Sequence, residues 1–163
     1  MKNKVQKAYF SGGCFWGVEN FFQNLRGFVS TRVGYMGGKT DNPTYEKVCR
    51  GDTGHAETLE IVFDANEIDF ETLAKIFFEI HDATQKNRQG PDSGNQYRSA
   101  IFYVDEEQKG IADKLVGILK EKGIEAMTEI SPAKNFYAAE EHHQKYYLKS
   151  GNSSACQVRK KIF

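Results

Sequence analysis

The feature that most constrains the fold is the alternation of short β-prone runs with amphipathic helical segments. In residues 15–25 and 69–81, apolar residues recur at spacings of three and four, which is typical of helices with one buried face. Residues 57–63 alternate apolar and polar side chains instead, as a half-buried strand does, and Asp69 is placed to cap the helix that follows. The expected strands are residues 7–11, 28–35, 57–63, 99–104 and 125–130, and the expected helices are residues 15–25, 44–50, 69–81, 106–122 and 138–148.

This pattern predicts a two-layer α+β sandwich, because the strands are too few and too short for a doubly wound sheet. The chain has 163 residues and contains no obvious linker, so we expect a single domain over residues 1–163. Residues 81–98 form a long polar stretch rich in Gly, Asn and Asp, which indicates a functional loop. Residues 149–163 are polar with weak periodicity, and we expect them to form a mobile C-terminal tail.

Composition excludes several functional classes. The 22 Lys and Arg residues balance the 22 Asp and Glu residues, so no bulk charge favours nucleic acid or a membrane surface. Three cysteines are an odd number without paired spacing, which argues against a secreted disulfide framework. The start of the chain has no apolar run typical of a signal peptide, and no stretch is long enough to cross a bilayer. These observations predict a cytoplasmic protein, which we expect to be a monomer.

Cys14 lies where a predicted strand ends, two glycines turn the chain and a predicted helix begins. The positive end of a helix dipole and the free N–H groups of its first turn favour a thiolate. The hypothesis of a nucleophilic cysteine competes with the commoner case of a buried, inert thiol. Phe15 and Trp16 point about 100° apart on a helix, so one or both can line a hollow beside the thiol. For Phe15, ordinary core packing is the competing interpretation.

Glu57 follows a glycine turn at the start of a predicted strand, in the sequence GHAE. If it faces Cys14 in a partly buried pocket, burial would raise its pKa and make it a general acid. The alternative is an exposed carboxylate at a strand end. A zinc deaminase is excluded, because the His-x-Glu pattern lacks the Cys-x-x-Cys pair that must follow it. Residues 140–143 (EEHH) are metal-like in composition but are interpreted as the solvated face of a helix.

Five segments, taken together, resemble the peptide methionine sulfoxide reductase A family. They are GCFWG at 13–17, GYMGG at 34–38, PTYEKVCRGDTGHAE at 43–57, HDATQKNRQGPDSGNQYRS at 81–99 and FYAAEEHHQKYY at 136–147. Their order is that of the family, and they span nearly the whole chain. The resemblance implies a ferredoxin-like α+β fold with a mixed, mainly antiparallel sheet. It also implies reduction of the S epimer of methionine sulfoxide, free or in proteins, which repairs oxidised proteins and needs no metal or organic cofactor.

The resemblance also implies a role for each candidate residue. Cys14 would attack the sulfoxide sulfur and become a sulfenic acid, and Glu57 would donate a proton to the sulfoxide oxygen. The aromatic and acidic residues would bind the substrate: the hydroxyls of Tyr45 and Tyr97 at the oxygen, Phe15 and Trp16 around the S-methyl group, and Asp92 at the substrate main chain.

The sequence of the tail does not decide how the sulfenic acid on Cys14 is reduced. The family often uses a resolving cysteine in a glycine-rich C-terminal segment, whereas this tail reads SGNSSACQVRKKIF. Cys156 is the first candidate, because a thiol in a mobile tail can reach Cys14. Cys49 is a second candidate, with a buried, inert thiol as its alternative. Otherwise an external thiol would reduce the sulfenic acid, and the expected reductants are thioredoxin, glutaredoxin or glutathione.

Two other functional classes compete with the reductase. A cysteine hydrolase would use Cys14 with His55 as its base, and it would work without a reductant. A noncatalytic module would bind methionine-like side chains in the hollow beside Phe15 and Trp16. Such a module would keep its binding when Cys14 is replaced by serine.

Overall fold

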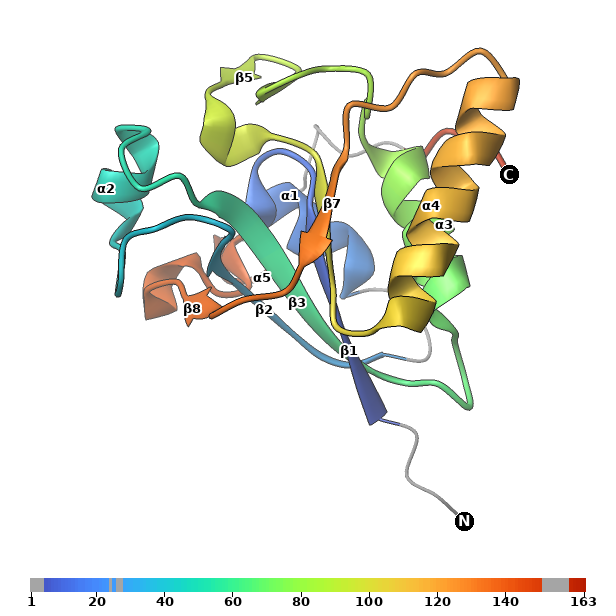
Figure 1. Cartoon of the computed structure of the whole chain (residues 1–163). Coiled ribbons are helices and arrows are strands. Elements are labelled where there is room, and N and C mark those ends of the chain that lie inside the picture. The colour runs from blue at the N-terminus through green and yellow to red at the C-terminus, as the bar shows by residue number, and fades with distance from the viewer. Residues whose placement is uncertain (1–4, 24, 26–27, 151–158) are drawn as a thin grey trace.

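The computed structural model describes residues 5–23, 25, 28–150 and 159–163, in which strands and helices alternate (Figure 1). Among these residues no helix is long and apolar enough to cross a membrane. Two single 3₁₀ turns, Asn95–Tyr97 and Glu141–His143, complete the regular structure. The elements are β1 (Val5–Ser11), α1 (Phe15–Phe22), β2 (Phe28–Met36), α2 (Tyr45–Cys49), β3 (Ala56–Asp64), α3 (Phe70–Ile80), β4 (Arg88–Gln89), β5 (Asp92–Ser93), β6 (Ala100–Tyr103), α4 (Glu106–Glu121), β7 (Glu129–Pro132), β8 (Tyr137–Ala138) and α5 (Tyr146–Ser150).

The main sheet has the strand order β7-β6-β1-β3-β2-β8, and every pairing except the parallel β6–β7 pair is antiparallel. Its central unit is β1-α1-β2-β3-α3-β6, with the strands in the spatial order β6-β1-β3-β2. That is the split βαβ arrangement of a ferredoxin-like fold. The predicted α+β class with a mainly antiparallel sheet is confirmed.

Side-chain alternation gives the sheet two different faces. On β1, Ala8 and Phe10 face the large core under α1 and α3, and Tyr9 faces the opposite side. The Phe10 ring stacks on Phe77 of α3, with ring centroids 4.9 Å apart. On the other face, Tyr9 packs against Phe136, which belongs to the segment between β7 and β8. The long helix α4 packs against α3 (Figure 1).

Two predicted elements differ from the structure. The predicted strand 125–130 is β7 (Glu129–Pro132), which begins four residues later. The predicted helix 138–148 is wrong: this region contains β8, a 3₁₀ turn and the short helix α5. The reason is that a side chain of this region forms hydrogen bonds with the backbone at the edge of the sheet. The Gln144 side chain accepts from Val33 N and donates to Val33 O, as a neighbouring strand would, and Lys145 adopts a left-handed φ of 53° that interrupts a helix.

Residues 159–163 return to the end of α3. Glu79 of α3 accepts hydrogen bonds from the side chain of Arg159 and from the backbone N–H groups of Ile162 and Phe163. Lys122, just after α4, donates to the carbonyl of Ile162. The end of the chain is thereby attached to the two helices that cover the sheet.

Candidate active site

Cys14 is positioned by the tight turn that joins β1 to α1. Gly13 has a φ of 94°, which favours glycine, and a side chain there would come within 2.8 Å of Gln89. A side chain at Gly12 would come within 2.9 Å of Phe77. Both glycines are therefore required by the close packing behind the turn. Cys14 itself occupies the N-cap position of α1 and is half-buried.

The predicted preference of Cys14 for the thiolate is not found in the substrate-free structure. Burial, together with the nearby carboxylates of Glu57 and Asp92, raises the pKa of the Cys14 thiol to about 12. The backbone N–H groups of Trp16 and Gly17 lower this pKa, as expected at a helix start, but by less. Helix position alone therefore does not ionise the thiol. Removal of the thiol proton needs a change in the surroundings.

Glu57 is the second candidate group, and it is buried at the start of β3 with 1% of its surface exposed. Its Oε1 atom accepts a hydrogen bond from the backbone N–H of Phe15, 3.2 Å away, which connects β3 to the first turn of α1. Its Oε2 atom is buried without a partner among the described residues. Burial raises the pKa of Glu57 to about 8, so the carboxyl group carries its proton at neutral pH. The predicted burial and pKa rise are both present.

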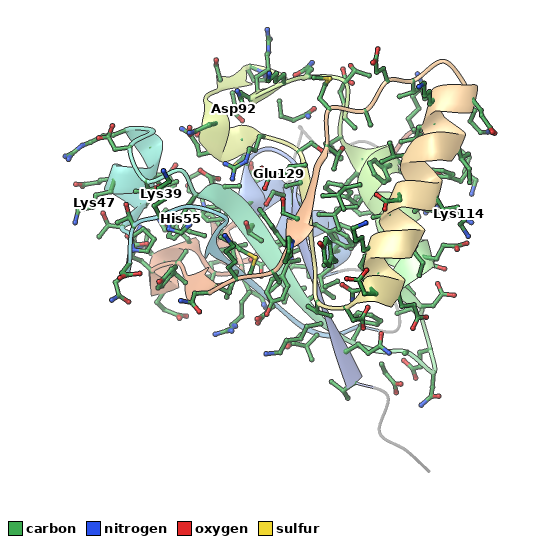
Figure 2. The ribbon with its side chains drawn as sticks, viewed as in Figure 1. Lys39, Lys47, His55, Asp92, Lys114 and Glu129 are labelled. Atoms are coloured by element: carbon green, nitrogen blue, oxygen red, sulfur yellow. The ribbon has the colours of Figure 1, made fainter. Side chains whose placement is uncertain are left out.

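Tyr45, Tyr97 and Asp92 come from three separate segments but lie around the same two groups. Burial raises the pKa of both tyrosines, and the negative charge of Glu57 raises it further. The charge of Asp92 raises the pKa of Tyr97, Glu57 and Cys14. Figure 2 shows Asp92 on the β4–β5 hairpin, which extends over the end of the sheet. The structure therefore brings these side chains together.

Phe15 and Trp16 have different surroundings. Phe15 is 1% exposed and packs against the rings of Tyr35, Tyr45 and His143, so the core-packing interpretation of this residue is correct. Trp16 is half-buried, and its ring is nearly parallel to that of Tyr45. Of the two side chains, only Trp16 therefore keeps part of its surface exposed. Phe15 is a buried member of the same aromatic cluster.

The interpretation of residues 140–143 as a solvated face is wrong for His143 and right for the exposed Glu140, although Glu140 also bonds to residues of the site. Glu140 accepts hydrogen bonds from the Tyr35 hydroxyl and from the backbone N–H of Tyr45. His143 is 2% exposed, and its ring lies 4.3 Å from that of Tyr45. Glu141 and His142 are exposed, as predicted. The signal for these residues in the sequence is the segment 136–147, which resembles the family.

The other two cysteines differ in what the structure describes. Cys49 ends α2 and is exposed, so the alternative of a buried thiol is wrong for it. The Tyr45 hydroxyl hydrogen-bonds the Cys49 sulfur, which places this thiol next to the tyrosine pair. Cys156, the first candidate for the resolving cysteine, lies outside the described residues.

His55 is not available as a base for Cys14. Its Nε2 atom lies 2.7 Å from the carbonyl oxygen of Thr40, and its Nδ1 atom accepts from the backbone N–H of Gly38, 2.9 Å away. Both ring nitrogens are therefore used to join the loops before and after α2. Figure 2 shows His55 on the loop beside α2, on a different segment from the hairpin that carries Asp92. The structure removes the main support for a cysteine hydrolase.

Known proteins match this chain along almost its full length. The family model for peptide methionine sulfoxide reductase matches residues 6–163. The chain belongs to the peptide methionine sulfoxide reductase family. The peptide methionine sulfoxide reductase MsrA of Methanothermobacter thermautotrophicus is 51% identical over 151 residues, which are 91% of this chain and 89% of the relative. The MsrA of Nautilia profundicola is 49% identical over 152 residues, which are 93% of this chain and 88% of the relative.

Solved structures of the family have the same fold. Reduced Mxr1 from Saccharomyces cerevisiae has a TM-score of 0.90 at 37% identity, with 97% of this chain and 93% of that chain covered. Methionine sulfoxide reductase A of Corynebacterium diphtheriae has a TM-score of 0.82 at 34% identity, with 98% and 85% covered. The predicted family and enzyme class are confirmed, and this chain is a peptide methionine sulfoxide reductase.

Proposed function

We propose that the chain reduces the S epimer of methionine sulfoxide, in proteins or free, through a sulfenic acid on Cys14. The single observation that carries this proposal is the buried, unpartnered Oε2 atom of Glu57. Its carboxyl group has a pKa of about 8 and stands beside a thiol with a pKa of about 12. A sulfoxide oxygen is a hydrogen-bond acceptor that must gain a proton before it leaves sulfur. A neutral carboxylic acid in an apolar site is the donor that this chemistry needs.

The proposed step balances in atoms and electrons. Glu57 gives its proton to the sulfoxide oxygen while the Cys14 sulfur attacks the sulfoxide sulfur. The S–O bond of the substrate breaks as an S–S bond to Cys14 forms. The hydroxyl that leaves then bonds to the Cys14 sulfur and breaks the S–S bond, so that methionine departs with the S–S electron pair and Cys14 becomes a sulfenic acid. The thiol proton replaces the one that Glu57 lost, so Glu57 ends the step protonated. The substrate sulfur is reduced by two electrons and the Cys14 sulfur is oxidised by two.

The remaining site residues bind the substrate in this proposal. Burial and the charge of Glu57 raise the pKa values of Tyr45 and Tyr97, so both hydroxyls remain donors at neutral pH. They can hydrogen-bond the oxygen as negative charge develops on it. Trp16, supported by Phe15, forms the apolar wall for the S-methyl group. Asp92 accepts from the substrate main chain.

Recycling needs a second thiol. A thiol attacks the sulfenic sulfur, a disulfide forms and the oxygen leaves as water. We assign this role first to Cys156 and second to the exposed Cys49, with thioredoxin, glutaredoxin or glutathione reducing the product. We place the reaction in the cytoplasm, where such thiol reductants keep cysteines reduced. Thiols supply all the electrons, so the reaction requires no metal or organic cofactor.

An assay with the two epimers of a methionine sulfoxide peptide and dithiothreitol tests the proposal. We expect consumption of the S epimer alone and none by Cys14→Ser. Turnover of the R epimer, or equal turnover by the Cys14→Ser variant, would contradict it. A hydrolase would act without dithiothreitol. A binding module would bind the peptide equally with serine at this position and reduce nothing.

Comparison of single turnover with thioredoxin-dependent turnover separates the two candidates for the resolving cysteine. With one equivalent of substrate, Cys156→Ser and Cys49→Ser should both form methionine at the wild-type rate. With thioredoxin as reductant, steady turnover should fall in the variant that lacks the resolving thiol. Unchanged turnover in both variants would assign the step to an external thiol.

A further inference from the structure

The Trp16 side chain is held by two residues from the far end of the chain. Its indole Nε1 donates to His143 Nδ1 at 3.1 Å. On the other side, the Tyr146 ring stacks on the indole with centroids 3.9 Å apart and an interplanar angle of 11°. The orientation of this ring therefore depends on where the segment from His143 to Tyr146 lies.

Between these two residues, Lys145 is fixed by a buried carboxylate. Its backbone N–H donates to Glu19 Oε1 at 2.6 Å, and its Nζ lies 3.3 Å from Glu19 Oε2. Lys145 has a φ of 53°, which is unfavourable for a residue with a side chain and is offset by these bonds. Glu19 also accepts from the hydroxyl of Thr31, and it is 1% exposed.

Glu19 and Trp16 lie three residues apart on α1, so they project from neighbouring positions of the same helix face. The helix thus holds the segment through Glu19, and the segment in turn holds the ring of Trp16. A buried charge is costly to desolvate, and an apolar residue of similar size would often be at least as stabilising. The hydrogen bonds of Glu19 have a different consequence, which is a fixed distance between α1 and the residues that contact Trp16.

We propose that Glu19 is a positioning residue for substrate binding, which acts through Lys145, His143 and Tyr146 to orient the Trp16 ring against the methyl group of the sulfoxide. This inference rests on the proposed role of Trp16 as the wall for that group. Glu19 touches neither the substrate nor Cys14 in this scheme. Its effect is on affinity, because a wall that contacts the methyl group equally before and during reaction contributes uniform binding.

The test uses Glu19→Gln in the full chain, with Glu79→Gln as the matched control. Glu79 is also buried, also accepts backbone N–H groups and also pairs with a basic side chain, but it holds residues 159–163 instead. Single-turnover rates are measured against the concentration of a methionine sulfoxide peptide. For Glu19→Gln we expect the half-saturation concentration to rise about three- to tenfold, in line with the loss of an ordered aromatic contact, while the plateau rate stays within about twofold. For Glu79→Gln we expect neither value to change.

Trp16 is the single tryptophan, so its fluorescence reports on this ring alone. Glu19→Gln should increase the quenching of Trp16 by acrylamide, and Glu79→Gln should not. This readout does not require activity. If wild-type protein reduces no sulfoxide, the proposed function fails, and quenching still decides whether Glu19 holds the ring.

A double-mutant cycle separates positioning from a loss of stability. His143→Phe keeps an aromatic ring but removes the acceptor for the indole N–H, and it leaves Glu19 and Lys145 intact. If both residues act on the same ring, the double variant should raise the half-saturation concentration by less than the product of the two single effects. A full product, or unchanged quenching in a folded Glu19→Gln variant, would overturn the inference. If Glu19→Gln fails to fold, unchanged quenching in His143→Phe would overturn it instead.

Discussion

Glu57 and Glu79 are both buried glutamates, with 1% and 2% of their surfaces exposed, yet their pKa values move in opposite directions. Glu57 accepts one hydrogen bond, from the N–H of Phe15, and burial raises its pKa to about 8. Burial also acts on Glu79, but two backbone N–H groups at the end of the chain and the guanidinium of Arg159 outweigh it and lower the pKa. The donors of Glu79 outweigh the cost of burial and keep it charged, whereas the single donor of Glu57 does not.

The difference assigns the two residues to different tasks. A carboxylate whose oxygens are all engaged is a structural anchor, and Glu79 attaches residues 159–163 to α3. A carboxyl group with a free oxygen and a retained proton is destabilising for the fold but useful for proton transfer.

The largest expected effect is on the chemical step. Glu57→Gln keeps the acceptor for the Phe15 N–H but has no acidic proton, so the single-turnover rate should fall about 10²- to 10⁴-fold. Glu79→Gln should react at the wild-type rate. The measurement is rapid-quench formation of methionine from the sulfoxide peptide. Comparable rates in wild type and Glu57→Gln would show that another group supplies the proton.

The pH dependence of the same rate gives the second test. In the proposed step Glu57 acts in its protonated form, and its pKa is about 8, so the single-turnover rate at low substrate should be flat below pH 8. Above that pH it should fall about tenfold per unit, as one required proton is lost. In Glu57→Gln this decline should disappear. A decline that persists in the variant would assign the titration to another group.

The fold of this protein is predictable where local pattern and global packing agree. The helix that begins after Asp69 was expected from its spacing and cap, and Asp69 does accept from the N–H of Thr72. The helix predicted over residues 138–148 is wrong for a physical reason. Its conformation depends on Gln144 pairing with Val33, and on Glu19 holding Lys145, contacts with partners more than 100 residues away.

The sequence names the candidate residues of the site but not their electrostatics. The structure brings Cys14, Glu57 and Tyr97 close enough for the two acidic groups to raise the pKa of the tyrosine. The thiol pKa was predicted in the wrong direction, because a helix start is visible in a sequence whereas burial next to carboxylates is not. His143 was missed for the same reason as Gln144, since its position follows from long-range contacts.

A smaller effect is expected on stability at alkaline pH. The pKa of Glu57 is about 8 in the folded protein against 4.5 for a free glutamate, so the folded state binds this proton more tightly. The resulting stabilisation is complete below pH 4.5 and is lost as the pH rises through 8. Between pH 5 and pH 8, wild type should lose on the order of 3 kcal/mol of unfolding free energy relative to Glu57→Gln. Urea unfolding at both pH values measures the difference, in which any constant cost of the glutamine cancels. Parallel pH profiles for the two proteins would contradict the raised pKa.

The smallest effect concerns Glu79 and has the opposite sign. Its pKa is lowered in the folded protein, so its contribution to stability is present above the unfolded value of 4.5 and is lost as the pH falls through the lower folded value. At pH 7, Glu79→Gln should therefore reduce the free energy of unfolding by about 2 kcal/mol, because glutamine binds the same donors without a charge. In acid the two proteins should become equally stable.

Urea titrations at pH 7 and pH 3 test this, with Glu71→Gln as the control, because Glu71 forms exposed ion pairs with Lys75 and Lys114. Such surface pairs contribute about 1 kcal/mol or less. If Glu79→Gln were no more destabilising than Glu71→Gln, the attachment of residues 159–163 would contribute no more than a surface ion pair, and the contrast with Glu57 would lie in the proton alone.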